Sequence, residues 1–238
     1  MTASSKPERL TGLRRHDIAT FLDGDENIGV ELGVAEGIFS ERMIRSGKFK
    51  QYFGVDMYSD RGHDTNQYKS ALRRVGLFSP YKLLRMRFDE ALDLYEDESL
   101  DFIYIDGYAH GGEEGGETIF SWYSKVKVGG LVAGDDYHQD WPLVLEAVDE
   151  FIRQSGEQLM LTEITEPDVP YSGYPTWCVR KTRKAELTAP AETIRKGKRE
   201  IKRVAREREG GWLVKIVPWI VPAPIIQRAG MLLRRWRA

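Results

Sequence analysis

Short apolar runs alternate with amphipathic stretches between residues 27 and 180, and this alternation predicts strands that alternate with helices. The expected strands are 27–32, 52–56, 81–86, 100–106, 131–133, 160–166 and 176–180. The expected helices are 39–46, 68–75, 88–95, 118–126 and 142–155, preceded by a short helix near 14–22. Elements in this order are typical of an α/β domain with a doubly wound, largely parallel sheet.

The closing strands set the polarity of one sheet edge and the boundaries of the domain. The loop between the last two strands is too short for a crossover helix, so we expect the last strand to be antiparallel. A turn at Gly129-Gly130 is expected to lead into the strand 131–133. We divide the chain into a lead-in, 1–24, a main domain, 25–182, and a basic, helical C-terminal tail, 183–238.

Composition narrows the class of protein. Of the 238 residues, 41% are hydrophobic and 30% are charged, as in a soluble globular domain with one full core. The single cysteine, Cys178, excludes an internal disulfide and a cysteine-only zinc site, and it suits a reducing cytoplasm. The first ten residues are polar and lack the apolar segment of a secretion signal. We therefore expect a cytoplasmic protein.

Charge is distributed unevenly along the chain. Residues 183–238 contain 15 basic and 5 acidic side chains, a net charge of +10, whereas residues 1–182 have a net charge of -12. The end of the tail is apolar but broken by prolines, and a bilayer-spanning helix needs about 20 mostly apolar residues. Trp212, Trp219 and Trp236 beside arginines instead indicate peripheral contact of residues 195–238 with an anionic membrane, on the inner face of the cell membrane.

Two other roles for the tail stay open. It could pack on the main domain, or it could serve as a dimerisation arm and make the protein a homo-oligomer. The proline-broken apolar end argues against nucleic acid as a partner, although a basic tail is compatible with one.

A glycine-rich turn follows the strand 27–32. This strand ends Val30-Glu31-Leu32, and Gly33 and Gly37 follow four residues apart before the next helix. Glycine lets a backbone approach a ligand closely, and turns at this edge of open α/β sheets bind ligands. The carboxylate of Glu31 suits a positively charged group such as an amino-acid ammonium. Asp56 ends the next strand, where an acid can accept hydrogen bonds from ribose hydroxyls. Together they favour a nucleoside ligand over an ordinary tight turn with a helix-capping Asp56.

Three carboxylates end two strands that are expected to be neighbours. Asp106 follows the strand 102–105, and Asp135 and Asp136 follow the next strand in the sequence. Clustered carboxylates must take up protons or share a cation, and oxygen ligands without cysteine suit Mg²⁺ or Mn²⁺. The cluster therefore predicts a metal site. The alternative is that Asp135 caps a helix and Asp136 is a solvated loop residue.

Two of the four histidines, His110 and His138, flank this cluster. Histidine is the usual acceptor of a hydroxyl proton near neutral pH. His110 is our first choice for a catalytic base because it lies in the loop just beyond Asp106, and His138 is the second. His63 is a further candidate to line the site, and for each of them a solvated loop position is the alternative.

These residues resemble a known family. The strand-end acid with Gly33 and Gly37, the second acid Asp56, and the segments IDGYAH, VGGLVAGDDYH and AVDEF are similar to those of class I S-adenosylmethionine-dependent methyltransferases. The similarity covers about residues 25–182. Within the family, the sequence most resembles the Mg²⁺-dependent O-methyltransferases that act on catechols and macrolide sugars.

The resemblance implies a Rossmann-like fold and a role for each motif residue. Glu31, Gly33 and Gly37 would hold the methionine end of the cofactor and Asp56 its ribose, with Asp106 also at the cofactor. Asp106, Asp135 and Asp136 would ligate the metal. In the sugar-modifying members the base is a histidine three residues after the first metal ligand; here Ala109 stands there and His110 follows it.

The expected function is a Mg²⁺-dependent O-methyltransferase that acts on a hydroxyl of a sugar or glycan, such as an envelope polysaccharide or glycolipid. The glycan rests on the sugar-modifying relatives and on the basic tail. Two alternatives remain: a hydroxylase-like enzyme on the same fold, and a non-catalytic S-adenosylmethionine-binding module recruited to a membrane. A nicotinamide-dependent dehydrogenase is disfavoured because Glu31 replaces the first glycine of the usual dinucleotide motif.

Overall fold

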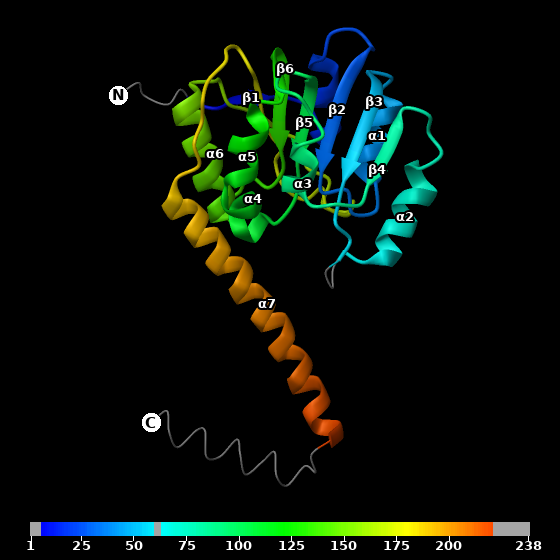
Figure 1. Cartoon of the computed structure of the whole chain (residues 1–238), viewed down its shortest axis with the longest axis vertical. Helices are drawn as coiled ribbons and strands as arrows, with labels where there is room; N and C mark the ends of the chain where they lie inside the picture. Colours follow the sequence, from blue (N-terminus) through cyan, green and yellow to red (C-terminus); the bar gives the residue numbers. More distant parts are fainter. Residues whose placement is uncertain (1–5, 60–62, 221–238) are drawn as a thin grey trace. The chain divides into compact units, whose positions relative to one another are not determined.

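The computed structural model describes residues 6–59 and 63–220 (Figure 1). The chain divides into two compact units, 1–198 and 199–238. The first unit is built on one eight-stranded sheet with the strand order β1-β7-β8-β6-β5-β2-β3-β4. The strands are β1 (Glu8–Leu10), β2 (Asn27–Leu32), β3 (Phe49–Val55), β4 (Tyr81–Leu84), β5 (Leu100–Ile105), β6 (Val126–Gly134), β7 (Met160–Thr162) and β8 (Trp177–Arg180).

Helices connect the strands and cover the sheet. The α-helices are α1 (Ile38–Arg45), α2 (Thr65–Val75), α3 (Phe88–Leu92), α4 (Gly112–Gly115), α5 (Glu117–Tyr123), α6 (Pro142–Ser155) and α7 (Ala191–Ile220). Two 3₁₀ helices, η1 (Arg15–Phe21) and η2 (Ala109–Gly111), complete the description.

Both faces of the central sheet are buried. On β5, Ile103 and Ile105 belong to the core cluster formed with α5 and α6, whereas Phe102 and Tyr104 belong to the cluster formed with α1 and η1. Strands buried on both faces are apolar along their whole length, which is why these strands were recognisable as continuous apolar runs.

The predicted fold class is confirmed. Strands β2 to β6 pair in parallel, and the last strand, β8, runs antiparallel to both β6 and β7. Figure 1 shows β2 between β3 and β5, so the ends of these strands meet at one edge of the sheet. We call the C-terminal ends of β3, β2, β5 and β6 the carboxyl edge.

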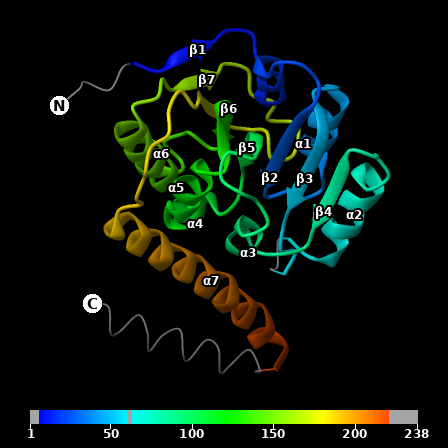
Figure 2. The same ribbon diagram turned by 45° about the horizontal axis from the view of Figure 1, so that its top comes forward.

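Two parts of the sheet differ from the expectation. The lead-in contributes a strand, β1, which pairs in parallel with β7, and Figure 2 shows the two side by side at the sheet's end. The expected turn at Gly129-Gly130 instead lies inside β6, where the pairing with β5 shifts register. Gly129 has φ +94 and its N–H donates to Lys181 O, so this pair forms a strand irregularity that needs glycine.

The first turns of α7 belong to the main unit and pack on it through glycines. A Cβ at Gly197 would lie 2.2 Å from Gly115 Cα and 2.3 Å from Gly111 O, so only glycine permits this approach. Lys196 pairs with Glu146 at 2.9 Å.

Among the helices of residues 6–59 and 63–220, none is both long and apolar enough to cross a bilayer. The membrane contact predicted through Trp212, Trp219 and Trp236 concerns side chains outside those that the structure describes.

Candidate active site at the carboxyl edge

The glycine turn after β2 lies against the end of β5. Gly33 has φ +94 and Gly37 has φ +75, and a Cβ at Gly33 would stand only 1.7 Å from Asp106 O. A side chain at position 33 would therefore collide with the backbone that follows β5. The predicted site has two parts, the glycine turn expected to hold a nucleoside and the carboxylate cluster. They are in direct contact, because Gly33 of the turn packs against Asp106 of the cluster.

Asp56 holds this turn in shape. Its Oδ2 accepts hydrogen bonds from the N–H groups of Val34 at 3.0 Å and Ala35 at 3.1 Å, and its Oδ1 accepts one from Tyr58 N at 3.0 Å. Ala35 itself has φ +48, a conformation that L residues rarely adopt. Asp56 therefore fixes a strained backbone in place, a role that the sequence did not indicate.

Glu31 lies buried behind the turn. Its side chain is 1% exposed, and its Oε2 accepts a hydrogen bond from Ser40 Oγ at 2.7 Å. Burial raises the pKa of Glu31 to about 8, against an ordinary value of 4.5. An incoming ammonium group would favour the ionised form and so would gain a strong partner.

The raised pKa of Glu31 makes stability depend on pH. Because folding favours the protonated carboxyl, its contribution is complete below about pH 4.5 and is lost as the pH rises toward about 8. We expect Glu31→Gln, which cannot ionise, to be more stable than the wild type near pH 9 by a few kcal/mol, since one pKa unit is about 1.4 kcal/mol. Near pH 5 the two proteins should differ little.

Urea denaturation at the two pH values measures this difference. The exposed Glu96→Gln is the matched control and should show no such dependence. An equal difference between Glu31→Gln and the wild type at both pH values would contradict the prediction.

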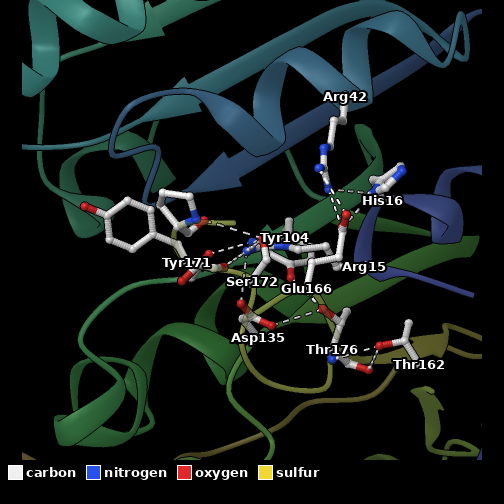
Figure 3. Close-up of polar contacts among 12 residues, drawn as sticks. Arg15, His16, Arg42, Tyr104, Asp135, Thr162, Glu166, Tyr171, Ser172 and Thr176 are labelled. Carbon is white, nitrogen blue, oxygen red and sulfur yellow. Dashed lines mark hydrogen bonds and ion pairs between the residues drawn. The ribbon is translucent and has the colours of Figure 1, made fainter. Parts of the chain in front are cut away.

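Two carboxylates of the cluster, those of Asp106 and Asp135, bind an arginine from the lead-in, and Figure 3 shows this Arg15 beside Asp135. Arg15 Nη2 donates to Asp106 Oδ2 at 2.7 Å, and Arg15 Nη1 lies 3.1 Å from Asp135 Oδ2. Both Arg15 and Asp135 are almost completely buried, 5% and 2% exposed. The other oxygen of Asp135 accepts a hydrogen bond from Thr176 Oγ1 at 3.1 Å. The expected convergence of Asp106 and Asp135 is therefore correct, and their shared cation is a guanidinium.

The predicted magnesium or manganese site is not supported. Within the described ranges, no group of three or more histidine, cysteine, aspartate or glutamate side chains is arranged to hold a metal ion. Arg15 already binds Oδ2 of both Asp106 and Asp135, and Thr176 donates to Oδ1 of Asp135, so these two carboxylates do not fit a shared divalent ion while Arg15 is in place. Asp135 also does not cap a helix: α6 begins at Pro142 and its N-cap is Trp141.

Asp136 and Glu113 add unbalanced acidity near this pair. Asp136 has φ +62, and burial together with Asp106 and Asp135 raises its pKa. Glu113 is fully buried; its Oε2 accepts a hydrogen bond from Gly107 N at 2.9 Å, whereas its Oε1 has no hydrogen-bond partner among the described residues. Burial, and then the charge of Asp136, raise the pKa of Glu113.

The two candidate bases stand at either end of an aromatic pair. The ring centroid of His110 lies 5.7 Å from that of Trp141, and His138 lies 5.0 Å from Tyr174. Trp141 and Tyr174 meet edge to face at 5.9 Å. The structure thus brings His110 and His138 to one aromatic cluster, although His138 also accepts a hydrogen bond from Asp140 N at 3.2 Å.

The loop between β7 and β8 covers part of this edge. His63 lies beside its Tyr171, with ring centroids 6.2 Å apart. Arg42 of α1 donates to both oxygens of Glu166 in the same loop, and Figure 3 shows His16 beside this pair. The loop is therefore fixed to the body of the domain by charged contacts.

Arg15 and Glu113 were not predicted from the sequence as residues of this site. The sequence does contain a signal for the burial of Arg15. Ile18, Ala19 and Leu22 are spaced so that Arg15 shares their buried face. A buried arginine requires carboxylate partners. Glu113 stands in a run of glycines and acids that is typical of a solvated loop, so its burial had no sequence signal.

The chain is similar to known proteins in sequence and in structure. Residues 28–137 match the profile of a family described as a methyltransferase domain. An uncharacterised protein of Acanthamoeba polyphaga mimivirus is 27% identical over 143 residues, which cover 57% of this chain and 64% of the viral protein. The chain therefore spans less than two thirds of that relative.

Solved structures share the fold. A SAM-dependent O-methyltransferase of Thermotoga maritima has a TM-score of 0.51 and 16% identity, with 71% of this chain and 65% of that chain covered. An N-methyltransferase of Bradyrhizobium japonicum has the same TM-score and identity, with 71% and 95% covered. Since these two proteins are named for different acceptor atoms, the fold leaves the acceptor open.

Proposed function

Because residues 28–137 match the profile of a family described as a methyltransferase domain, we propose that this protein transfers a methyl group from S-adenosylmethionine to a hydroxyl group. The predicted class of enzyme, a SAM-dependent methyltransferase, is supported by this family match. The acceptor and the roles of single residues are proposals. These proposals are supported mainly by the contact of Gly33 with Asp106, which places the glycine turn after β2 beside the carboxylate cluster.

The cofactor residues are proposed as follows. The backbone turn that Gly33 and Gly37 permit would hold the methionine end of the cofactor, and Glu31 would accept a hydrogen bond from its ammonium group. Asp56 keeps the turn in shape and presents its remaining lone pairs to the ribose hydroxyls. Asp106, at the contact between turn and cluster, completes the cofactor side of the edge.

The transfer is a direct displacement. The acceptor oxygen forms a bond to the methyl carbon as the carbon–sulfur bond breaks, and the sulfonium becomes a neutral thioether. The hydroxyl proton goes to His110, with His138 as the second candidate. Most of the acceleration comes from holding the oxygen and the methyl group in line.

A sugar or glycan hydroxyl is the proposed acceptor. Trp141 and Tyr174 offer flat apolar surfaces on which the C–H face of a sugar packs, with histidines at either end to take a proton. The dependence on magnesium or manganese predicted from the sequence is not carried into this proposal, because Arg15 holds the carboxylates that would bind the ion.

Incubation with a methyl-labelled donor and a panel of sugars, phenols and amines tests the function. We expect label in a sugar ether, at equal rates with and without a chelator. Calorimetry with S-adenosylmethionine and with NADH tests the cofactor alone. Binding of S-adenosylmethionine without transfer to any acceptor class would contradict the enzyme and favour the binding module. Transfer to amines only would contradict the hydroxyl acceptor.

We also propose that α7 contacts anionic lipid. Arg199, Lys202 and Arg206 are spaced three and four residues apart and therefore share one face of the helix. Each basic residue near an anionic surface contributes about 1 kcal/mol. We expect the full chain to sediment with phosphatidylserine vesicles and a triple glutamine variant of these residues to sediment much less.

A triple glutamine variant of Lys50, Lys69 and Lys82 is the control, since these exposed lysines lie outside α7. Equal sedimentation of both triple variants, or equal binding to neutral phosphatidylcholine vesicles, would contradict a role for α7.

A further inference from the structure

We propose that Arg15 is the resident cation of this site and takes the place between Asp106 and Asp135 that a divalent ion would occupy. The chain then supplies the cation that pairs with two of its own strand-end carboxylates. This inference deepens the proposed function, on which it rests for the nature of the site, by assigning a positioning residue from outside the matched domain.

The guanidinium of Arg15 bridges the two carboxylates. Two nitrogens of one guanidinium bind one oxygen each from Asp106 and Asp135, at 2.7 and 3.1 Å. These carboxylates come from the ends of adjacent parallel strands, β5 and β6. A Mg²⁺ ion between the two carboxylates would lie about 2.0–2.1 Å from their oxygens, in the space that the guanidinium fills. A planar fork of donors and a metal ion cannot both fill this space.

The side chain of Arg15 is also held in position by aromatic rings and by its own buried helix. Its guanidinium carbon lies 4.5 Å from the ring centroid of Phe39 and 5.1 Å from that of Tyr104. Its helix, η1, buries Ile18 and Ala19 in the core cluster below β5 and β6. An arginine that is buried, stacked and paired in this way is part of the folded core, since its release would leave two carboxylates without a partner.

The guanidinium of Arg15 also contacts the loop between β7 and β8. Arg15 Nη1 donates to Tyr171 O and lies 3.5 Å from Ser172 Oγ. Both residues belong to the loop between β7 and β8, which also contains Glu166. Arg15 therefore ties this loop to the strand ends, a connection that a small ion bound to the carboxylates alone would not provide. The guanidinium sets both the charge of the edge and the position of the loop over it.

If Arg15 fills this position, metal binding should differ between the wild type and a variant that lacks the guanidinium. The wild-type protein should not bind a divalent ion at this edge, because the oxygens are taken. Removal of the guanidinium should open the position, since it leaves Asp106 and Asp135 facing a vacated space with Asp136 and Glu113 near them.

Titration with Mn²⁺, followed by electron paramagnetic resonance of the free ion, tests both statements. The proteins are the wild type, Arg15→Met, the double variant Arg15→Met/Asp135→Asn, and the control Arg42→Met. Arg42 also pairs with the loop, through Glu166, but it does not touch Asp106 or Asp135. We expect Arg15→Met to bind Mn²⁺ about tenfold or more tightly than the wild type. The double variant and Arg42→Met should behave like the wild type.

Two results would overturn the proposal. One is an Arg15→Met protein that is folded by circular dichroism and gains no Mn²⁺ binding. The other is Mn²⁺ binding by the wild type that disappears in Asp135→Asn, a result that does not depend on the folding of any Arg15 variant. Calorimetry of the wild type with S-adenosylmethionine keeps the questions apart: a protein that binds no S-adenosylmethionine contradicts the proposed function, whereas the Mn²⁺ titrations still decide the role of Arg15.

Discussion

A Gly33→Ala protein is expected to lose about 3–5 kcal/mol of its free energy of unfolding, and its affinity for S-adenosylmethionine with it. The new Cβ would lie 1.7 Å from Asp106 O and 2.6 Å from the carbonyl carbon of the same residue. Backbone at the end of a buried parallel strand cannot move aside without breaking its pairing. The positive φ of Gly33 adds strain to the clash.

Gly24→Ala separates strain from collision. Gly24 also has a positive φ, +61, but a Cβ at this position would have no heavy atom within 4 Å, so this change should destabilise by only about 1 kcal/mol. Urea denaturation gives both free energies, and calorimetry gives the affinity. If Gly33→Ala proved as mild as Gly24→Ala, the close approach of the turn to β5 would be wrong.

Loss of the Asp56 carboxylate is expected to weaken S-adenosylmethionine binding by about 100-fold or more, because three charge-assisted hydrogen bonds hold the turn. Asp56→Ala removes all three acceptors and releases the strained Ala35. In Asp56→Asn, one acceptor becomes a donor that faces backbone N–H groups. We therefore expect Asn to retain only part of the affinity, as measured by calorimetry.

Asp101→Ala is the matched control. Asp101 also accepts a backbone hydrogen bond, from Ile28 N at 2.9 Å, but at the opposite end of β2 and β5. Its loss should lower stability by about 1 kcal/mol and leave cofactor affinity unchanged. A similar loss of affinity in Asp101→Ala and Asp56→Ala would show that stability, rather than the shape of the turn, limits binding.

The elements that carry a strong local pattern were predictable from the sequence. The strand Asn27–Leu32 and the helix Pro142–Ser155 have the predicted bounds, because continuous apolar runs and helical spacing reflect burial directly. The meeting of Asp106 and Asp135 was predictable as well, since successive strands of a doubly wound sheet are often neighbours.

The parts that failed depend on contacts between distant residues. Arg15 and Asp106 are 91 residues apart, and no local pattern couples them. The prediction of a metal came from counting carboxylates, which gives the charge to be balanced but not the group that balances it. Strand β1 has only three residues, too few to show an alternation, so its pairing with β7 had no local signal either.

The pairing of β1 with β7 bears on the order of folding during synthesis. Residues 8–21 leave the ribosome before their partners in β7, Asp135 and Ser172, which follow much later in the sequence. Residues 8–21 must therefore wait for nearly the whole domain before they dock. Until then the carboxylates repel one another, so we expect this edge to close in the final step of folding.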